Sequence, residues 1–363
     1  MIGIKEMITK MKDNVIFDFP DDYIISVNLL DGFTVDDVRV GMKAFSSLLI
    51  QLFDVMLLNT NNPITEEEPT ASGLGLTNVY ADIKKPLSLL YAMGVCGKPG
   101  GGSLLIDGSK LNDLYKKMHG NKPLEYMRLL QDAGLVFSVD LSAKSLNLNN
   151  VGIIELNYPD NAAALIGLKV LAEAASKINR QIYMGDIIYT FARCDYNTIS
   201  SPKKYIYEMP LITKFLPNDY RDFFVRLHGI LLSSKCKCEA KINMNDYQFT
   251  YKPKKGTANI CSINIAFDRS TVRINSRLIA EQPDLFAEAP QSICDAVKNG
   301  FTCLKKANPD ACNPKCNSKN LSFSLAGEEH LKCWIINFAL PVNENSEREF
   351  VQKWLQKELS FYE

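Results

Sequence analysis

The chain is poor in histidine and tryptophan and carries no excess charge of either sign. It has 363 residues with three histidines and two tryptophans, and its 41 Lys and Arg residues balance its 41 Asp and Glu residues. A net charge of zero excludes strong long-range attraction to polyanions, so any nucleic-acid contact requires a local basic patch. The histidines form neither an H-x3-H nor an H-E-x2-H pattern, which excludes the common helical signatures of a zinc enzyme.

The N-terminus lacks the continuous apolar segment of a secretory signal, since lysines interrupt every apolar run in the first 12 residues. The most apolar stretch, residues 44–58, is shorter than the roughly 20 residues that a bilayer core requires. We therefore expect a cytoplasmic protein that does not enter a membrane, with residues 44–58 in a buried helix. In that reducing compartment the ten cysteines would be metal ligands, reactive thiols or buried core residues rather than disulfides.

Signatures of catalysis are also missing. The glycine-rich segment 96–103 (CGKPGGGS) neither ends in Gly-Lys-Ser/Thr nor fits G-x-G-x-x-G, so it predicts a turn rather than a phosphate loop. No G-x-S-x-G elbow of a serine hydrolase is present. A small-molecule enzyme with a site between two domains stays the alternative, because catalytic residues often come from distant positions. Candidates for such a site are Cys194, whose pKa Arg193 could lower, and His228. The favoured interpretations are a core cysteine, because neighbours in sequence need not point the same way, and a core or boundary histidine.

The hydrophobic periodicity changes along the chain and predicts an α+β fold of two domains. A length of 363 residues exceeds what one hydrophobic core usually supports. Helical periodicity dominates residues 1–160, which we assign to an N-terminal domain. Residues 161–363 form a cysteine-rich C-terminal domain, in which period-two alternation from residue 235 predicts an antiparallel sheet with flanking helices. A hairpin is expected over residues 321–340, and a capping box at Ser346 and Glu349 opens the closing helix.

Residues 109–160 have the clearest local organisation. Apolar residues at helical spacing predict one helix that ends at Gly120 and a second that begins at Pro123 and ends at Gly134. Alternating residues then predict a two-stranded hairpin up to Tyr158. The order helix, short turn, helix and two-stranded wing is that of a winged helix, whose second helix can enter the DNA major groove.

Basic residues in this winged-helix-like segment are the candidate nucleic-acid contacts. They are Lys116, Lys117, Lys122, Arg128 and Lys144. Two acidic residues, Glu125 and Asp132, share the polar face of the second helix and would repel phosphate. A structural helix pair with a hairpin is therefore the alternative interpretation, because lysines on helices commonly form a solvated face.

Four cysteines near the C-terminus form the strongest candidate metal site. Cys303, Cys312, Cys316 and Cys333 follow the spacing C-x8-C-x3-C-x16-C. A structural zinc ion needs four thiolates or imidazoles in a tetrahedron, and residues 304–320 have almost no apolar side chains that could order them otherwise. His330 is the one histidine that could replace a cysteine ligand. Because the spacing lacks a C-x2-C pair, scattered free thiols stay the alternative.

A second group of cysteines lies in the predicted sheet. Cys236 and Cys238 alternate with lysines, so both thiols face the same side of their strand. Cys261 on a neighbouring predicted strand could join them in a redox or metal site. Three buried thiols on the core face of the sheet are the simpler interpretation.

Residues 135–160 (LVFSVDLSAKSLNLNNVGIIELNYPD), together with the cysteine pattern from Cys303 to Cys333, carry a family resemblance. They resemble an uncharacterised family of bacterial proteins, mostly from anaerobic Gram-positive bacteria. The similarity runs from about residue 100 to the C-terminus, without a catalytic motif to which it can be anchored. It implies a bacterial, cytosolic protein and assigns no active-site residues.

Together these features favour a non-catalytic binding or regulatory protein. Its ligand would be DNA or a small molecule, with a structural zinc site in the C-terminal domain. The alternatives are the small-molecule enzyme described above and a purely structural protein that binds its partner through a large exposed apolar patch.

Overall fold

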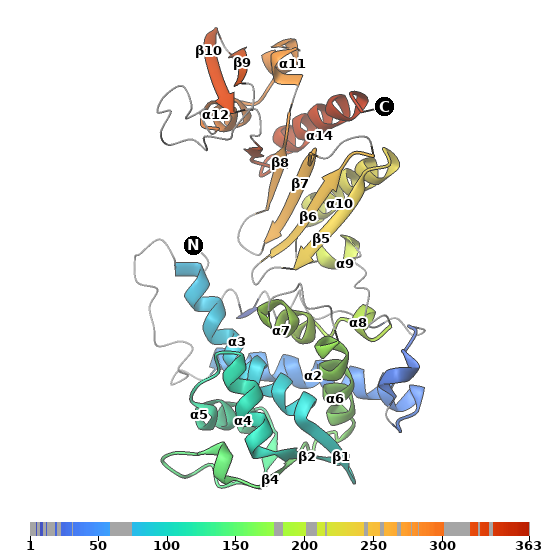
Figure 1. The fold of residues 1–363 in the computed structure, drawn as a ribbon, viewed down its shortest axis with the longest axis vertical. Coiled ribbons are helices and arrows are strands. Elements are labelled where there is room, and N and C mark those ends of the chain that lie inside the picture. The colour runs from blue at the N-terminus through green and yellow to red at the C-terminus, as the bar shows by residue number, and fades with distance from the viewer. Residues whose placement is uncertain are drawn as a thin grey trace. The chain divides into compact units, whose positions relative to one another are not determined.

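The computed structural model describes most of the chain. Described are residues 23–30, 32–58, 75–177, 184–200, 209–214, 216–242, 246–254, 258–266, 270–276, 278–281, 283–300, 320–325, 327–333 and 337–362, with residues 5, 8, 9, 12 and 19. The chain forms two compact units. Unit 1 is Met1–Phe215 with Asn243–Asn245, and unit 2 is Leu216–Ile242 with Asp246–Glu363. Helices and antiparallel sheets occur in both units, which confirms the predicted α+β class (Figure 1).

Unit 1 is mainly helical. Its elements are η1 (Val27–Leu29), α2 (Val35–Leu58), α3 (Gly75–Cys96), β1 (Gly97–Gly100), β2 (Ser103–Asp107), α4 (Gly108–Lys117), α5 (Pro123–Asp132), β3 (Val136–Phe137), η2 (Leu148–Asn150), β4 (Ile153–Asn157), α6 (Ala163–Ser176), α7 (Met184–Ala192), α8 (Tyr196–Ser200) and α9 (Met209–Ile212).

The core of unit 1 is built on α2, α3 and α6, which pack against one another. α6 is rich in alanine, and a Cβ atom added at its one glycine, Gly167, would lie 2.2 Å from the carbonyl oxygen of Gly41 on α2. A Cβ at Gly94 of α3 would lie 2.8 Å from the carbonyl oxygen of Leu168. The three backbones therefore touch at glycines, where no side chain separates them. Because α6 packs here, the compact units divide at residues 215/216, whereas the sequence predicted a division at residues 160/161.

The predicted buried helix over residues 44–58 is the second half of α2. A reciprocal pair caps its N-terminus: the Asp37 amide donates to Thr34 Oγ1 at 3.1 Å, and the Thr34 amide donates to Asp37 Oδ2 at 2.9 Å. α2 is long and apolar enough to span a membrane by length and composition alone. In the structure ten of its residues, from Val38 to Met56, are buried inside unit 1.

A four-stranded antiparallel sheet completes unit 1, with the order β1-β2-β4-β3. The glycine-rich segment forms the turn between β1 and β2. Gly101 and Gly102 have φ angles of 63° and 97°, a left-handed backbone at both central positions that favours glycine in two-residue hairpins. The prediction of a turn at this segment is confirmed.

Unit 2 combines a larger sheet with helices. Its elements are α10 (Asn218–Ser233), β5 (Lys237–Ile242), β6 (Asp246–Lys252), β7 (Cys261–Ala266), β8 (Thr271–Ile274), η3 (Leu278–Ala280), α11 (Pro283–Ala287), α12 (Gln291–Lys298), β9 (Asn320–Leu325), β10 (Glu328–Cys333), β11 (Phe338–Leu340) and α14 (Asn345–Ser360).

The main sheet of unit 2 is antiparallel with the order β11-β8-β7-β6-β5, and β9 and β10 form a separate hairpin. The predicted meander is confirmed. The segment expected to form one hairpin over residues 321–340 instead divides, because β11 pairs with β8 of the main sheet. The closing helix begins at Asn345, and its capping box uses Glu344 and Glu347 rather than the predicted residues Ser346 and Glu349.

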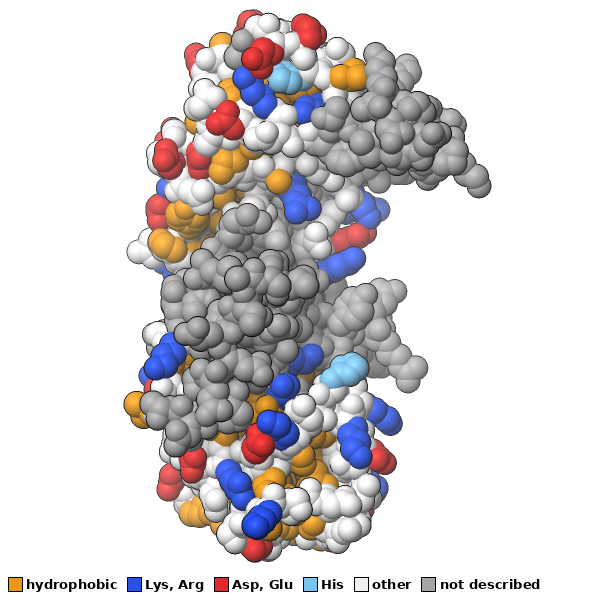
Figure 2. Space-filling view, turned by 90° about the vertical axis from the view of Figure 1, so that its left-hand side faces the viewer, with side chains coloured by type: hydrophobic (Ala, Val, Ile, Leu, Met, Phe, Trp, Pro, Cys, Tyr) orange, Lys and Arg blue, Asp and Glu red, His pale blue; other side chains and the backbone are white. Residues whose placement is uncertain are grey.

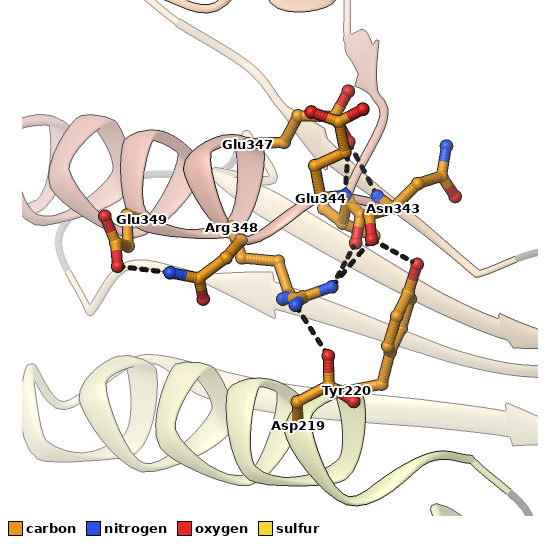
Figure 3. Close-up of polar contacts among 9 residues, drawn as sticks. Asp219, Tyr220, Asn343, Glu344, Glu347, Arg348 and Glu349 are labelled. Carbon is orange, nitrogen blue, oxygen red and sulfur yellow. Dashed lines mark hydrogen bonds and ion pairs between the residues drawn. The ribbon is translucent and has the colours of Figure 1, made fainter.

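The N-terminal ends of α10 and α14 are joined by one buried arginine, Arg348 (Figure 3). Its guanidinium pairs with Asp219 at 2.7 Å and donates to the carbonyl oxygens of Val342 and Asn343 at 3.2 and 2.9 Å. It also lies 4.5 Å from the centroid of the Tyr220 ring. The two helices therefore run in the same direction on the core side of the sheet, where Trp354 and Phe338 contact each other.

Candidate functional site

Two helices followed by two paired strands are present in unit 1 in the predicted order. α4 and α5 are separated by five residues, both pack against α3, and β3 and β4 follow. β4 pairs on one side with β2, which precedes α4, and on the other side with β3. The strand order β2-β4-β3 thus joins the segment into one module. The loop between β3 and β4 is called the wing below, after the predicted order of elements.

Side-chain hydrogen bonds fix this wing at several points. Asp140 Oδ1 accepts from the amide and hydroxyl groups of Ser142 at 2.8 and 2.7 Å, and these bonds hold the pKa of Asp140 below its ordinary value. At the other end of the loop, Asn112 of α4 donates to the side chain of Asn149 at 2.7 Å. The wing is therefore attached to α4 as well as to the sheet.

Arg128 is engaged within the module. Its Nε and Nη2 atoms donate to the carbonyl oxygens of Leu141 and Ala143, each at 2.7 Å. A guanidinium that satisfies two backbone carbonyls holds the wing against α5. The structure thus gives Arg128 an internal role, although the sequence suggested it as a phosphate contact.

The four lysines of the candidate interface are exposed. Lys116 and Lys117 lie in the last turn of α4, where they also complement the negative end of the helix dipole. Lys122 precedes α5 with a φ angle of 49° and forms an ion pair with Glu125 at 3.5 Å. Lys144 lies on the wing. The α4–α5 turn thus presents positive charge before the N-terminal end of α5, and Lys144 follows Ala143, whose carbonyl oxygen accepts from Arg128 in the middle of α5.

α5 itself exposes only a narrow polar face. Five of its ten residues are buried, and the exposed ones are Arg128, Gln131 and Asp132. In the space-filling view, lysine and arginine side chains are scattered over the lower part of the visible face and do not merge into a continuous stripe (Figure 2). This arrangement supports contacts with phosphate groups more than the reading of base edges by the second helix.

The predicted zinc site falls mainly outside the described residues. Cys303, Cys312 and Cys316 lie outside them, as does the side chain of Cys333, whose backbone ends β10 opposite Asn320. Within the described ranges, no group of three or more His, Cys, Asp or Glu side chains could hold a metal ion. Zinc at these cysteines stays a prediction.

The second cysteine group lies on the core face of the main sheet. Cys238 and Cys261 are directly opposite Tyr251, on either side of it, and the Tyr251 hydroxyl lies 2.6 Å from Nδ1 of His228 on α10. Burial raises the pKa values of Cys236, Cys238 and Cys261 and lowers the pKa of His228. Protonated thiols and a neutral imidazole fit a core layer, as in the simpler of the two sequence interpretations.

Cys194 is fully buried after α7, as expected of a core cysteine. Burial and the neighbouring Asp195 raise the pKa of its thiol well above the ordinary value, although Arg193 precedes it in the sequence. The thiol is therefore protonated and inaccessible, which does not suit a catalytic nucleophile. Neither Cys194 nor His228 supports the enzyme alternative.

One concave feature was missed from the sequence. A groove of about 690 Å³ lies between the C-terminal halves of α10 and α14. It is lined by Arg226, Gly229, Ile230, Ser233, Ser234, Gln352, Gln356, Leu359 and Ser360. The only available signal was the pair of glutamines one helical turn apart on α14, which is also typical of a solvated helix face. No protein-family model, curated protein or solved structure matches this chain.

Proposed function

We propose that this chain is a non-catalytic nucleic-acid-binding protein, with the winged-helix-like segment of unit 1 as its contact surface. The observation that carries the proposal is the closure of α4, α5 and the wing into one module by the strand order β2-β4-β3. In such a module the turn between the helices and the wing both approach the nucleic-acid backbone. A structural zinc site at Cys303, Cys312, Cys316 and Cys333 in the C-terminal part remains part of the proposal.

Phosphate contact is the chemistry that this surface supports. Lys116, Lys117, Lys122 and Lys144 are exposed, and each can neutralise one phosphate group. Arg128 acts indirectly, because it fixes the wing on which Lys144 lies. Glu125 and Asp132 on α5 weaken the local field, so we expect modest affinity and little discrimination between sequences.

The test measures binding of the full-length protein to a labelled 20-base-pair DNA duplex by fluorescence anisotropy over a range of salt concentrations. If the four lysines each contact a phosphate, the slope of log K against log salt is about −3.6 from the module alone. Replacing all four lysines by Glu should flatten the slope by that amount. The control carries Lys98→Glu and Lys177→Glu, which change exposed lysines on β1 and at the end of α6. Binding that is unaffected by the four substitutions would contradict the proposal.

A further inference from the structure

The main sheet of unit 2 has one apolar face and one polar face. Strict alternation across the paired strands places Cys238, Tyr251, Cys261, Ile274 and Phe338 in one row of directly opposite residues. His228 on α10 and Trp354 on α14 contact this face, which forms the core. In Figure 1, α10 lies behind the strands, so the other face of the sheet is turned toward the viewer.

The opposite face carries only polar, charged and small side chains among the described residues. One row across all five strands is Glu239, Thr250, Ser262, Arg273 and Ala339, and the next row is Lys241, Gln248, Asn264 and Thr271. Lys237 and Lys252 are opposite each other in a third row. These side chains are all half-buried or exposed. The face is therefore accessible and rich in hydrogen-bond donors.

Charge on this polar face is mainly positive. Its described side chains include four cations and one carboxylate, Glu239, which pairs with Lys252 at 2.8 Å, and the strand register adds one further acidic position, Asp246 opposite Ala266. Lys237, Lys241 and Arg273 form no ion pair with a described carboxylate within 4.0 Å. Lys237 and Lys252 are also directly opposite each other, a like-charge pair that is unfavourable in an isolated sheet. A bound polyanion would relieve this repulsion, whereas the net charge of the whole chain is zero.

We propose that this polar sheet face, defined by Lys237, Lys241, Lys252 and Arg273, binds the phosphate backbone of double-stranded nucleic acid. Neighbouring strands are about 4.8 Å apart, so Arg273 on β8 lies about 14 Å across the sheet from Lys237 and Lys241 on β5. This separation is close to the ~12 Å width of a DNA major groove. Cations at this separation can contact phosphates of both strands. The described part of the face has no aromatic side chain on which unpaired bases could stack, which favours a duplex over a single strand.

The test uses the full-length protein and the labelled 20-base-pair duplex. The triple variant Lys237→Glu, Lys241→Glu, Arg273→Glu should bind at least 10-fold more weakly and flatten the salt slope by about 2.7. The control variant changes three cations of the helical layer, Arg226, Lys353 and Lys357, to Glu and should retain wild-type affinity. Urea unfolding of both variants, followed by tryptophan fluorescence, checks that unit 2 is folded.

The outcomes separate this proposal from the one for unit 1. Wild-type affinity in the triple variant overturns the sheet proposal and leaves the winged-helix-like segment untouched. The sheet proposal is supported if the triple variant loses binding, while the variant with the four unit 1 lysines replaced still binds the duplex with the part of the salt slope that Lys237, Lys241 and Arg273 contribute. If poly-glutamate at the same charge concentration competes as effectively as DNA, the sheet proposal is overturned in favour of an acidic protein partner. Tighter binding of a single strand than of the duplex would also overturn it.

Discussion

The closest backbone contact in unit 1 gives a quantitative prediction. A Cβ atom at Gly167 would lie 2.2 Å from the carbonyl oxygen and 2.6 Å from the carbonyl carbon of Gly41, and 2.8 Å from Cβ of Phe45. Both partners at the shortest contact are backbone, so Gly167→Ala must move α2 and α6 apart by about 1 Å, at a cost of about 3 kcal/mol. The higher helix propensity of alanine returns about 1 kcal/mol. We expect a net loss of about 2 kcal/mol in the free energy of unfolding of unit 1.

Gly229 of α10 is the matched control, because an added Cβ would meet nothing within 4 Å. Gly229→Ala should stabilise unit 2 by about 0.5–1 kcal/mol through helix propensity alone. Both tryptophans lie in unit 2, so fluorescence reports that unit, whereas circular dichroism reports the helices of both units. Urea unfolding of Gly167→Ala should shift the circular dichroism transition and leave the fluorescence midpoint unchanged. Wild-type or higher stability of unit 1 in Gly167→Ala would refute the reasoning.

Further predictions concern other buried or engaged groups. Arg128→Ala should accelerate hydrogen exchange in the wing and cost unit 1 about 1–2 kcal/mol; unchanged exchange rates would count against a positioning role. Arg348→Ala should cost unit 2 about 2–4 kcal/mol in urea unfolding, because it removes an ion pair and two carbonyl bonds together. Burial lowers the pKa of His228 from 6.5, so below about pH 6.5 the unfolded chain takes up a proton that the folded chain does not. Unit 2 should therefore lose stability between pH 7.5 and 5.5, and His228→Gln should remove that part of the loss; an identical pH dependence in the variant would exclude His228 as its source. Elemental analysis should find about one zinc per chain, lost on replacing Cys312 and Cys316 by Ser, and a metal-free protein with freely titrating thiols would contradict the zinc site.

Much of the fold follows from local patterns in the sequence. The α2 helix, the order of α4, α5 and the wing, and the meander of unit 2 were all predicted, because periodicity and capping residues act over a few neighbouring positions. The sequence did not predict the pairing of elements that depend on contacts between distant parts of the chain. The assignment of β11 to the main sheet depends on which partners the chain meets after it folds. The start of α14 is local, but it uses the capping box of Glu344 and Glu347 where the sequence also offered Ser346 and Glu349.

For the side chains of the candidate site, too, the sequence predicted some features and only the tertiary structure decided others. The sequence alone identified the basic residues of the winged-helix-like segment, since composition and spacing reveal where charge lies along the chain. Tertiary structure decided that Arg128 bonds to the wing, that the Cys194 thiol is buried, and that Lys237, Lys241 and Arg273 share one open sheet face. Strand register brings these three cations together from positions up to 36 residues apart. Such pairings depend on the free energy of packing the whole core, which no local pattern encodes.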